Sequence, residues 1–87
     1  EPGYYGSKFG IRIENLELIK KAGKFLSFET LTLIPYEKKL IDKSLLSKTE
    51  INQINKYHKL VNEKIRPLIN RRDGDLVNFL NSKTSIL

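Results

Sequence analysis

Two glutamates, Glu1 and Glu14, are the residues of this sequence best suited to catalytic chemistry. They stand at the two ends of one glycine-bearing stretch, EPGYYGSKFGIRIEN. Carboxylates from neighbouring strands can hold two divalent metal ions, and such a metal pair activates a water for hydrolysis. Because side chains alternate along a strand, Arg12 would share the face of Glu14. Exposed or ion-paired carboxylates would show the same spacing, so spacing alone indicates only part of a possible site.

His58 is the single histidine, and the chain has no cysteine. It falls between Ile54 and Val61 on the apolar stripe of an expected helix, with no second histidine or cysteine nearby. We therefore expect a packed, hydrogen-bonded core residue and not a metal ligand. No serine has a histidine at a recognisable spacing, so a serine nucleophile has no support. The glycines also lack the Lys-Ser/Thr ending and the following helix of a phosphate-binding loop.

The first part of the chain is expected to position the glutamates on a β-hairpin. Residues 1–10 are interpreted as a loop, because Pro2 and three glycines interrupt the pattern. Residues 11–21 and 25–34 are predicted strands joined by a tight turn, the second ended by Pro35. Both strands carry apolar side chains on both faces. Since two strands alone are marginally stable in water, we expect a larger sheet outside this sequence to cover them.

The second part is predicted to be helical. Ser47 and Glu50 have the spacing of a capping box, which predicts a helix over residues 48–66 with Pro67 near its end. Its apolar stripe, spaced by three and four residues, comprises Ile51, Ile54, His58, Val61, Ile65 and Leu68. A short helix over residues 75–82 follows, with Asp75 as its expected cap. The fold class is therefore α+β.

Composition limits the class of protein further. The 87 residues are 39% hydrophobic and 30% charged, which suits one small folded piece. Nothing resembles a membrane span or a signal peptide, and a sequence opening Glu-Pro-Gly is expected to come from within a longer gene product. We expect a cytoplasmic location and no membrane partner.

The net charge of +6 lies in one region, because residues 37–72 contain ten Lys/Arg and only four acids. This region could meet an anionic partner, but a solvated helical face explains it more simply. The interleaved aromatic residues of single-strand platforms are missing from it, so no nucleic-acid partner is expected.

The stretch EPGYYGSKFGIRIEN, followed by FETLTLIPYEKKLID and the later KYHKLV, closely resembles the C-terminal end of the Xaa-Pro aminopeptidases. These enzymes belong to the pita-bread metallopeptidases, which are related to prolidase and methionine aminopeptidase. The resemblance covers residues from Glu1 to about Phe79. It implies that residues 1–36 end the catalytic domain and that residues 37–87 form a helical extension.

The resemblance also implies roles for four residues. By the match, Glu1 and Glu14 are two of five ligands of a dinuclear centre, usually manganese, with zinc or cobalt as alternatives. Tyr5 and Arg12 match residues that help to order the site, and Glu1 matches the residue to which the family resemblance assigns the role of proton shuttle. The two aspartate ligands and the histidine ligand of the family precede the matching stretch. Residues 1–87 by themselves are therefore expected to be inactive and to bind metal weakly.

The function implied by the resemblance is removal of the N-terminal residue from peptides with proline in second position. The expected partners are such peptides, the rest of the same polypeptide and a second copy in a homodimer. The alternative is a non-catalytic interaction module that uses the helix at residues 48–66 as its contact surface. A basic nucleic-acid binder ranks below both.

Overall fold

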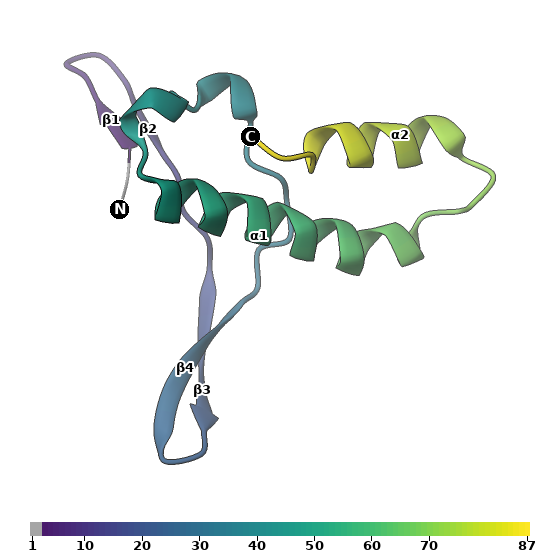
Figure 1. The fold of residues 1–87 in the computed structure, drawn as a ribbon, viewed down its shortest axis with the longest axis horizontal. Coiled ribbons are helices and arrows are strands. Elements are labelled where there is room, and N and C mark those ends of the chain that lie inside the picture. The colour runs from purple at the N-terminus through teal and green to yellow at the C-terminus, as the bar shows by residue number, and fades with distance from the viewer. Residues whose placement is uncertain (1–2) are drawn as a thin grey trace. The chain divides into compact units, whose positions relative to one another are not determined.

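The computed structural model describes residues 3–87 of the chain (Figure 1). The chain forms two compact units: a hairpin unit up to Thr32, and a helical unit from Leu33 to Leu87. The hairpin unit contains two antiparallel pairs, and the helical unit contains two α-helices and three short 3₁₀ turns. The α+β prediction is confirmed by this combination. The predicted division at residue 36 concerns the complete domain and stays a prediction.

The first antiparallel pair lies where a loop was predicted. Strand β1 (Gly3–Tyr5) pairs with β2 (Gly10–Arg12), and the register places Gly3 opposite Arg12. The turn between them is closed by Gly6 N–H, which donates to the Phe9 carbonyl at 2.9 Å. The loop prediction was wrong for residues 3–5 and for Gly10, because strands of three residues are too short to show an alternating apolar pattern.

The predicted strand over residues 11–21 is divided in two. β2 ends at Arg12, and β3 (Glu17–Ala22) begins five residues later and pairs with β4 (Phe25–Thr30). The turn between β3 and β4 uses Gly23 with φ of 62°, a conformation that favours glycine. β4 ends at Thr30 and not at the predicted residue 34. The division lets β2 and β3 pair with different partners.

The β3–β4 hairpin exposes apolar side chains on both faces. Ile19 and Phe28 are paired in the register and are 62% and 70% exposed, and Leu26 on the same face is 71% exposed. On the other face Leu18 is 48% exposed and Phe25 is 79% exposed. The expectation that a larger sheet covers this hairpin stays a prediction, and the exposed apolar surface is what such a sheet would bury.

Helix α1 (Lys48–Ile65) begins with the predicted capping box. Ser47 Oγ accepts from Glu50 N–H at 3.1 Å, and Glu50 Oε1 accepts from Ser47 N–H at 3.0 Å. After Ile65 the chain tightens into a 3₁₀ turn, Arg66–Leu68, which contains Pro67. The helix therefore ends where proline removes a backbone donor. Neither helix in residues 3–87 is both long enough and apolar enough to cross a membrane.

The core of the helical unit lies on one face of α1. Ile54, His58 and Val61 are buried there, and helix α2 (Gly74–Lys83) adds the buried Leu80. The predicted stripe was wrong at its last position, because Leu68 is 80% exposed. This residue lies beyond the end of α1, where the 3₁₀ turn changes the direction of the side chains.

Helix α2 is capped two residues earlier than predicted. Asp73 Oδ1 accepts from Leu76 N–H at 3.0 Å, and Asp75 lies inside the first turn. The helix starts at Gly74 because the carboxylate of Asp73 satisfies a backbone donor that would otherwise lack a partner. Asp75 instead places a negative charge near the positive end of the helix dipole. The prediction that Asp75 is the cap was therefore wrong.

Candidate functional site

The hairpin unit brings two of the predicted site residues into direct contact. Arg12 Nη2 donates to Glu14 Oε1 at 3.1 Å, and the two side chains are 45% and 52% exposed. Arg12 is the last residue of β2, and Glu14 follows in the extended segment after it. Arg12 and Glu14 were expected to share one face of the strand, and in the structure they form an ion pair. The guanidinium restricts the carboxylate, which stays open to solvent.

Tyr5 lies on the same face of the β1–β2 hairpin as Arg12. In the register Gly3 is opposite Arg12 and Tyr5 is opposite Gly10, and residues two apart on a strand face the same way. Tyr5 Cδ1 is 3.9 Å from the position that a Cβ on Gly10 would take, so the ring lies beside Gly10. The hairpin therefore gathers a phenol, a guanidinium and a carboxylate on one face.

Carboxylate oxygen is the donor that hard divalent ions prefer, so Glu14 fits the predicted ligand role by its chemistry. The contact with Arg12 uses Oε1, and the Glu14 side chain is 52% exposed. Glu1, the other predicted ligand and the predicted base, lies outside the described residues. Among residues 3–87 no group of three or more His, Cys, Asp or Glu side chains is close enough to hold a metal. A complete centre would need further ligands.

His58 occupies the core of the helical unit, as expected from its place on the stripe. It is fully buried, and its Nε2 accepts from the backbone N–H of Tyr36 at 3.0 Å. The rings of Tyr36 and Tyr57 lie 5.7 and 5.9 Å from the imidazole centroid. Burial lowers the pKa of His58, and the nearby Lys38 ammonium lowers it further. His58 is therefore a neutral acceptor that ties the segment before α1 to the helix.

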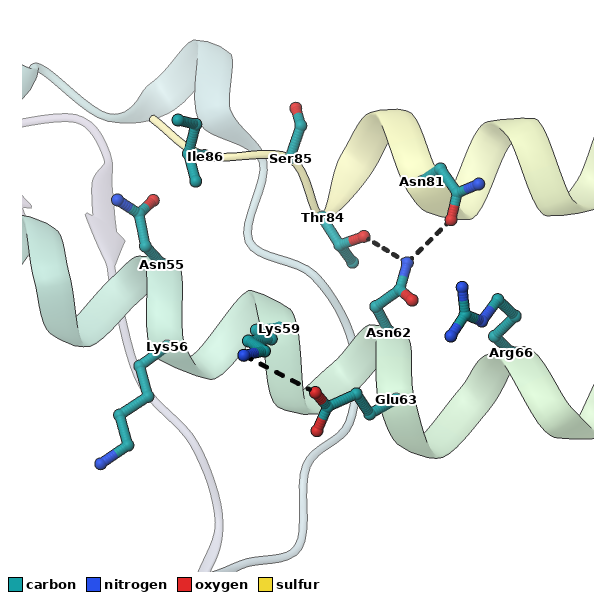
Figure 2. A pocket seen from close by; sticks show the side chains of 10 residues that line it. All are labelled: Asn55, Lys56, Lys59, Asn62, Glu63, Arg66, Asn81, Thr84, Ser85 and Ile86. Atoms are coloured by element: carbon teal, nitrogen blue, oxygen red, sulfur yellow. Dashed lines mark hydrogen bonds and ion pairs between the residues drawn. The ribbon is translucent and has the colours of Figure 1, made fainter.

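A groove of about 580 Å³ runs along α1 beside α2 and the segment after it (Figure 2). Asn62 spans it, because its Nδ2 donates to Asn81 Oδ1 and to Thr84 Oγ1, both at 2.9 Å. The other side chains that line the groove are mainly polar or basic: Asn55, Lys56, Lys59, Glu63, Arg66, Ser85 and Ile86.

This groove was not predicted from the sequence. Its lining includes Asn55, Lys59 and Asn62 of α1 and Arg66 directly after the helix, spaced by four, three and four. This polar stripe at helical spacing was the available signal. Lys59 pairs with Glu63 at 4.0 Å, so the groove keeps an excess of positive charge from Lys56 and Arg66.

Comparison with known proteins gives one family match and several relatives. A family model described as the C-terminal region of peptidase M24 matches residues 24–87. The sequence is 46% identical over 91 residues to Xaa-Pro aminopeptidase 1 of Dictyostelium discoideum, covering 95% of this chain and 14% of that protein. It is 44% identical over 78 residues to Xaa-Pro aminopeptidase 2 of Sus scrofa, covering 83% of this chain and 12% of that protein.

A solved structure is similar over nearly the whole chain. It is the X-prolyl aminopeptidase of Caenorhabditis elegans, described as a cytosolic enzyme with a di-nuclear active site. The match has a TM-score of 0.72 and 34% identity, and it covers 99% of this chain and 15% of the solved one. The fold is thus that of a fragment of such a pita-bread domain. The chain spans only about a seventh of the length of the relatives it matches.

Proposed function

We propose that this chain, which belongs to the C-terminal region of peptidase M24, supplies part of the catalytic domain of an Xaa-Pro aminopeptidase. The complete protein would remove the N-terminal residue from peptides that have proline in second position. Relatives named for this activity support the proposal. The observation that carries it is the 3.1 Å ion pair between Arg12 and Glu14, on the face of the hairpin that also presents Tyr5.

Each of the predicted site residues has a proposed role. Glu1 and Glu14 would be two ligands of a dinuclear centre, and manganese is the proposed metal, with zinc or cobalt as alternatives. When bound, the metal pair supplies an acidified water and polarises the scissile carbonyl. Arg12 fixes the orientation of the Glu14 carboxylate, and a fixed ligand binds metal more tightly than a mobile one. Tyr5 contributes a hydroxyl to the same face, and Glu1 would act as the proton shuttle.

The rest of the proposal concerns the complete protein. The remaining ligands would come from earlier parts of the same polypeptide, as the family resemblance implies, and the enzyme would act in the cytoplasm. A similar structure described as a cytosolic enzyme with a di-nuclear active site supports the cytoplasmic location and a centre of two metal ions. Residues 1–87 alone should show no turnover of an Xaa-Pro peptide with manganese, because a lone carboxylate pair cannot hold two metal ions.

A manganese titration of the full-length protein tests the ligand role of Glu14. Glu14→Gln keeps the size of the side chain but removes its charge, so calorimetry should show weaker binding or a lower metal stoichiometry, and peptidase activity should fall by two orders of magnitude or more. Glu29→Gln, at an exposed position on β4, is the matched control and should behave as wild type. Unchanged metal binding and turnover in Glu14→Gln would reject the proposal.

A second function is supported by the groove along α1. Its excess of positive charge would complement an acidic surface of a protein partner, in line with the interaction or dimerisation role predicted for this helix. Replacing Lys56 and Arg66 by glutamate should then lower the mass measured by sedimentation of the full-length protein. Lys48→Glu, at the start of α1 and outside the groove, is the control. An unchanged mass would show that the groove along α1 is not the surface through which two copies associate.

A further inference from the structure

Among the glycines of residues 3–32, Gly3 leaves the least room for a side chain. It is the register partner of Arg12, and a Cβ built on Gly3 would overlap the carbonyl oxygen of Ile11. It would also be 3.0 Å from Arg12 Cα and 3.2 Å from Arg12 Cγ. Two of these three atoms belong to the backbone of β2, so a side-chain rotation in β2 cannot relieve the contact. Any residue other than glycine would have to push β1 and β2 apart.

From this contact we infer that Gly3 is a positioning residue for the Arg12–Glu14 ion pair. The inference rests on the proposed function and extends it to a residue that binds neither metal nor substrate. Without a Cβ at residue 3, β1 can lie against the backbone of Ile11 and Arg12. This close approach determines where the Arg12 side chain leaves the strand. The guanidinium then reaches Glu14 at 3.1 Å, and the carboxylate is held in place.

The other glycines of this hairpin do not have the same effect. A Cβ on Gly10 would be 3.1 Å from the Tyr4 carbonyl, a smaller overlap. A Cβ on Gly6 would be 2.9 Å from two atoms at the end of the Tyr4 ring and 3.0 Å from the Phe9 carbonyl. Neither would meet an atom of Arg12 within 4 Å among its three nearest neighbours. The steric link to the ion pair is therefore specific to Gly3 within this turn.

Metal binding by the full-length protein with Gly3→Ala tests the inference. We expect manganese affinity, measured by calorimetry, to fall about tenfold to a hundredfold, as for lost partners of metal ligands in other proteins. Gly74→Ala is the matched control, because a Cβ on Gly74 meets nothing within 4 Å and its φ is not positive. Wild-type affinity in Gly3→Ala would overturn the inference.

A double-mutant cycle separates positioning from general damage. If Gly3 acts through Arg12, then Gly3→Ala should change metal affinity less than twofold in a protein that already carries Arg12→Ala. If the two losses add, Gly3 does not act through the ion pair and the inference is wrong. Thermal unfolding of each variant runs alongside, and we expect Gly3→Ala to melt within a few degrees of Gly74→Ala.

Two further measurements keep the inference distinct from the proposed function. Wild-type metal binding in Glu14→Gln would reject the proposed function itself, whereas a loss in Glu14→Gln with none in Gly3→Ala would reject only the role of Gly3. If Gly3→Ala does not fold, a crystal structure of the wild-type full-length protein decides the matter. The inference requires the built Cβ of Gly3 to lie under 3.0 Å from the Ile11 carbonyl oxygen, and ordinary contact at 3.4 Å or more would overturn it.

Discussion

The hairpin unit and the helical unit differ in what holds them together. The helical unit has its own buried residues on α1 and α2, a capped helix and a buried histidine that joins two segments. The hairpin unit consists of two separate two-stranded pairs, and most of its apolar side chains are exposed. The comparison teaches that the residues proposed for chemistry lie in the unit with the least core of its own.

This difference has a physical basis. A two-stranded hairpin buries too little apolar area to offset the entropy of ordering its backbone, whereas packed helices bury more. In the hairpin unit, local polar contacts take the place of a core: Arg12 pairs with Glu14 at 3.1 Å, and Leu16 N–H donates to Thr32 Oγ1 at 2.9 Å. Changes in the hairpin unit should affect metal binding and turnover, and changes in the helical unit should affect stability.

Arg12→Lys should produce the largest effect and tests the chemical side of this comparison. Lysine keeps the charge but loses the planar guanidinium that reaches Glu14, so kcat/KM should fall about tenfold to a hundredfold. Steady-state assays of the full-length protein on an Xaa-Pro peptide measure it. Arg71→Lys, in the helical unit, should change nothing. Equal losses in both variants would remove the distinction between the units.

Val61→Ala tests the stability side of the comparison. Val61 is fully buried on α1, so deleting its methyl groups should lower the free energy of opening of the helical unit by about 2 kcal/mol. Amide hydrogen exchange of α1 in the full-length protein measures this locally. Leu68→Ala is the control, since Leu68 is 80% exposed and should change the value by less than about 0.5 kcal/mol. A changed manganese affinity in Val61→Ala would argue against separate roles.

Acid should weaken the helical unit through His58. Burial, with help from Lys38, lowers its pKa in the folded state below the usual 6.5, so the unfolded state binds the proton more readily. Stability is thus fully present above about pH 6.5 and is lost as the pH falls towards the folded-state pKa. Protection of α1 amides should decrease over this window. In His58→Gln, which cannot titrate, we expect no such decrease.

Two carboxylates of the helical unit also have lowered pKa values, but they change charge at a lower pH than His58 and can be told apart from it. The pKa of Glu50 is lowered by hydrogen bonds from Ser47, and the pKa of Glu37 is lowered by the Lys39 backbone N–H and by Lys83. Their stabilising effect is present above their usual value of 4.5 and is lost below it. A loss of protection confined to this lower range would exclude His58 as the cause.

Ser47→Ala should give the smallest of these effects. Removing the cap of α1 leaves the Glu50 amide without its acceptor and should cost about 1 kcal/mol. Exchange of the first-turn amides of α1 should report the change. Ser47→Asp restores an acceptor at the same position and should recover most of the protection. If metal binding also changed in Ser47→Ala, the two units would be more strongly coupled than we propose.

The local elements were predictable where one strong signal existed. The capping box at Ser47 and Glu50 and the stripe through His58 predicted α1 to within one residue, because cap and period act within a few residues of sequence. Strand boundaries were less predictable. β1 and the break between β2 and β3 depend on which segments pair, and that choice is made between distant residues.

By itself, the sequence determined the helical unit, the family and the pairing of Arg12 with Glu14, since these follow from local spacing and from a specific motif. Only the tertiary structure decided that Gly3 faces Arg12, that Asp73 caps α2 and that Asn62 spans a groove. These features depend on contacts between atoms brought together by folding. A residue's neighbours along the chain do not specify such contacts, so sequence patterns could not show them.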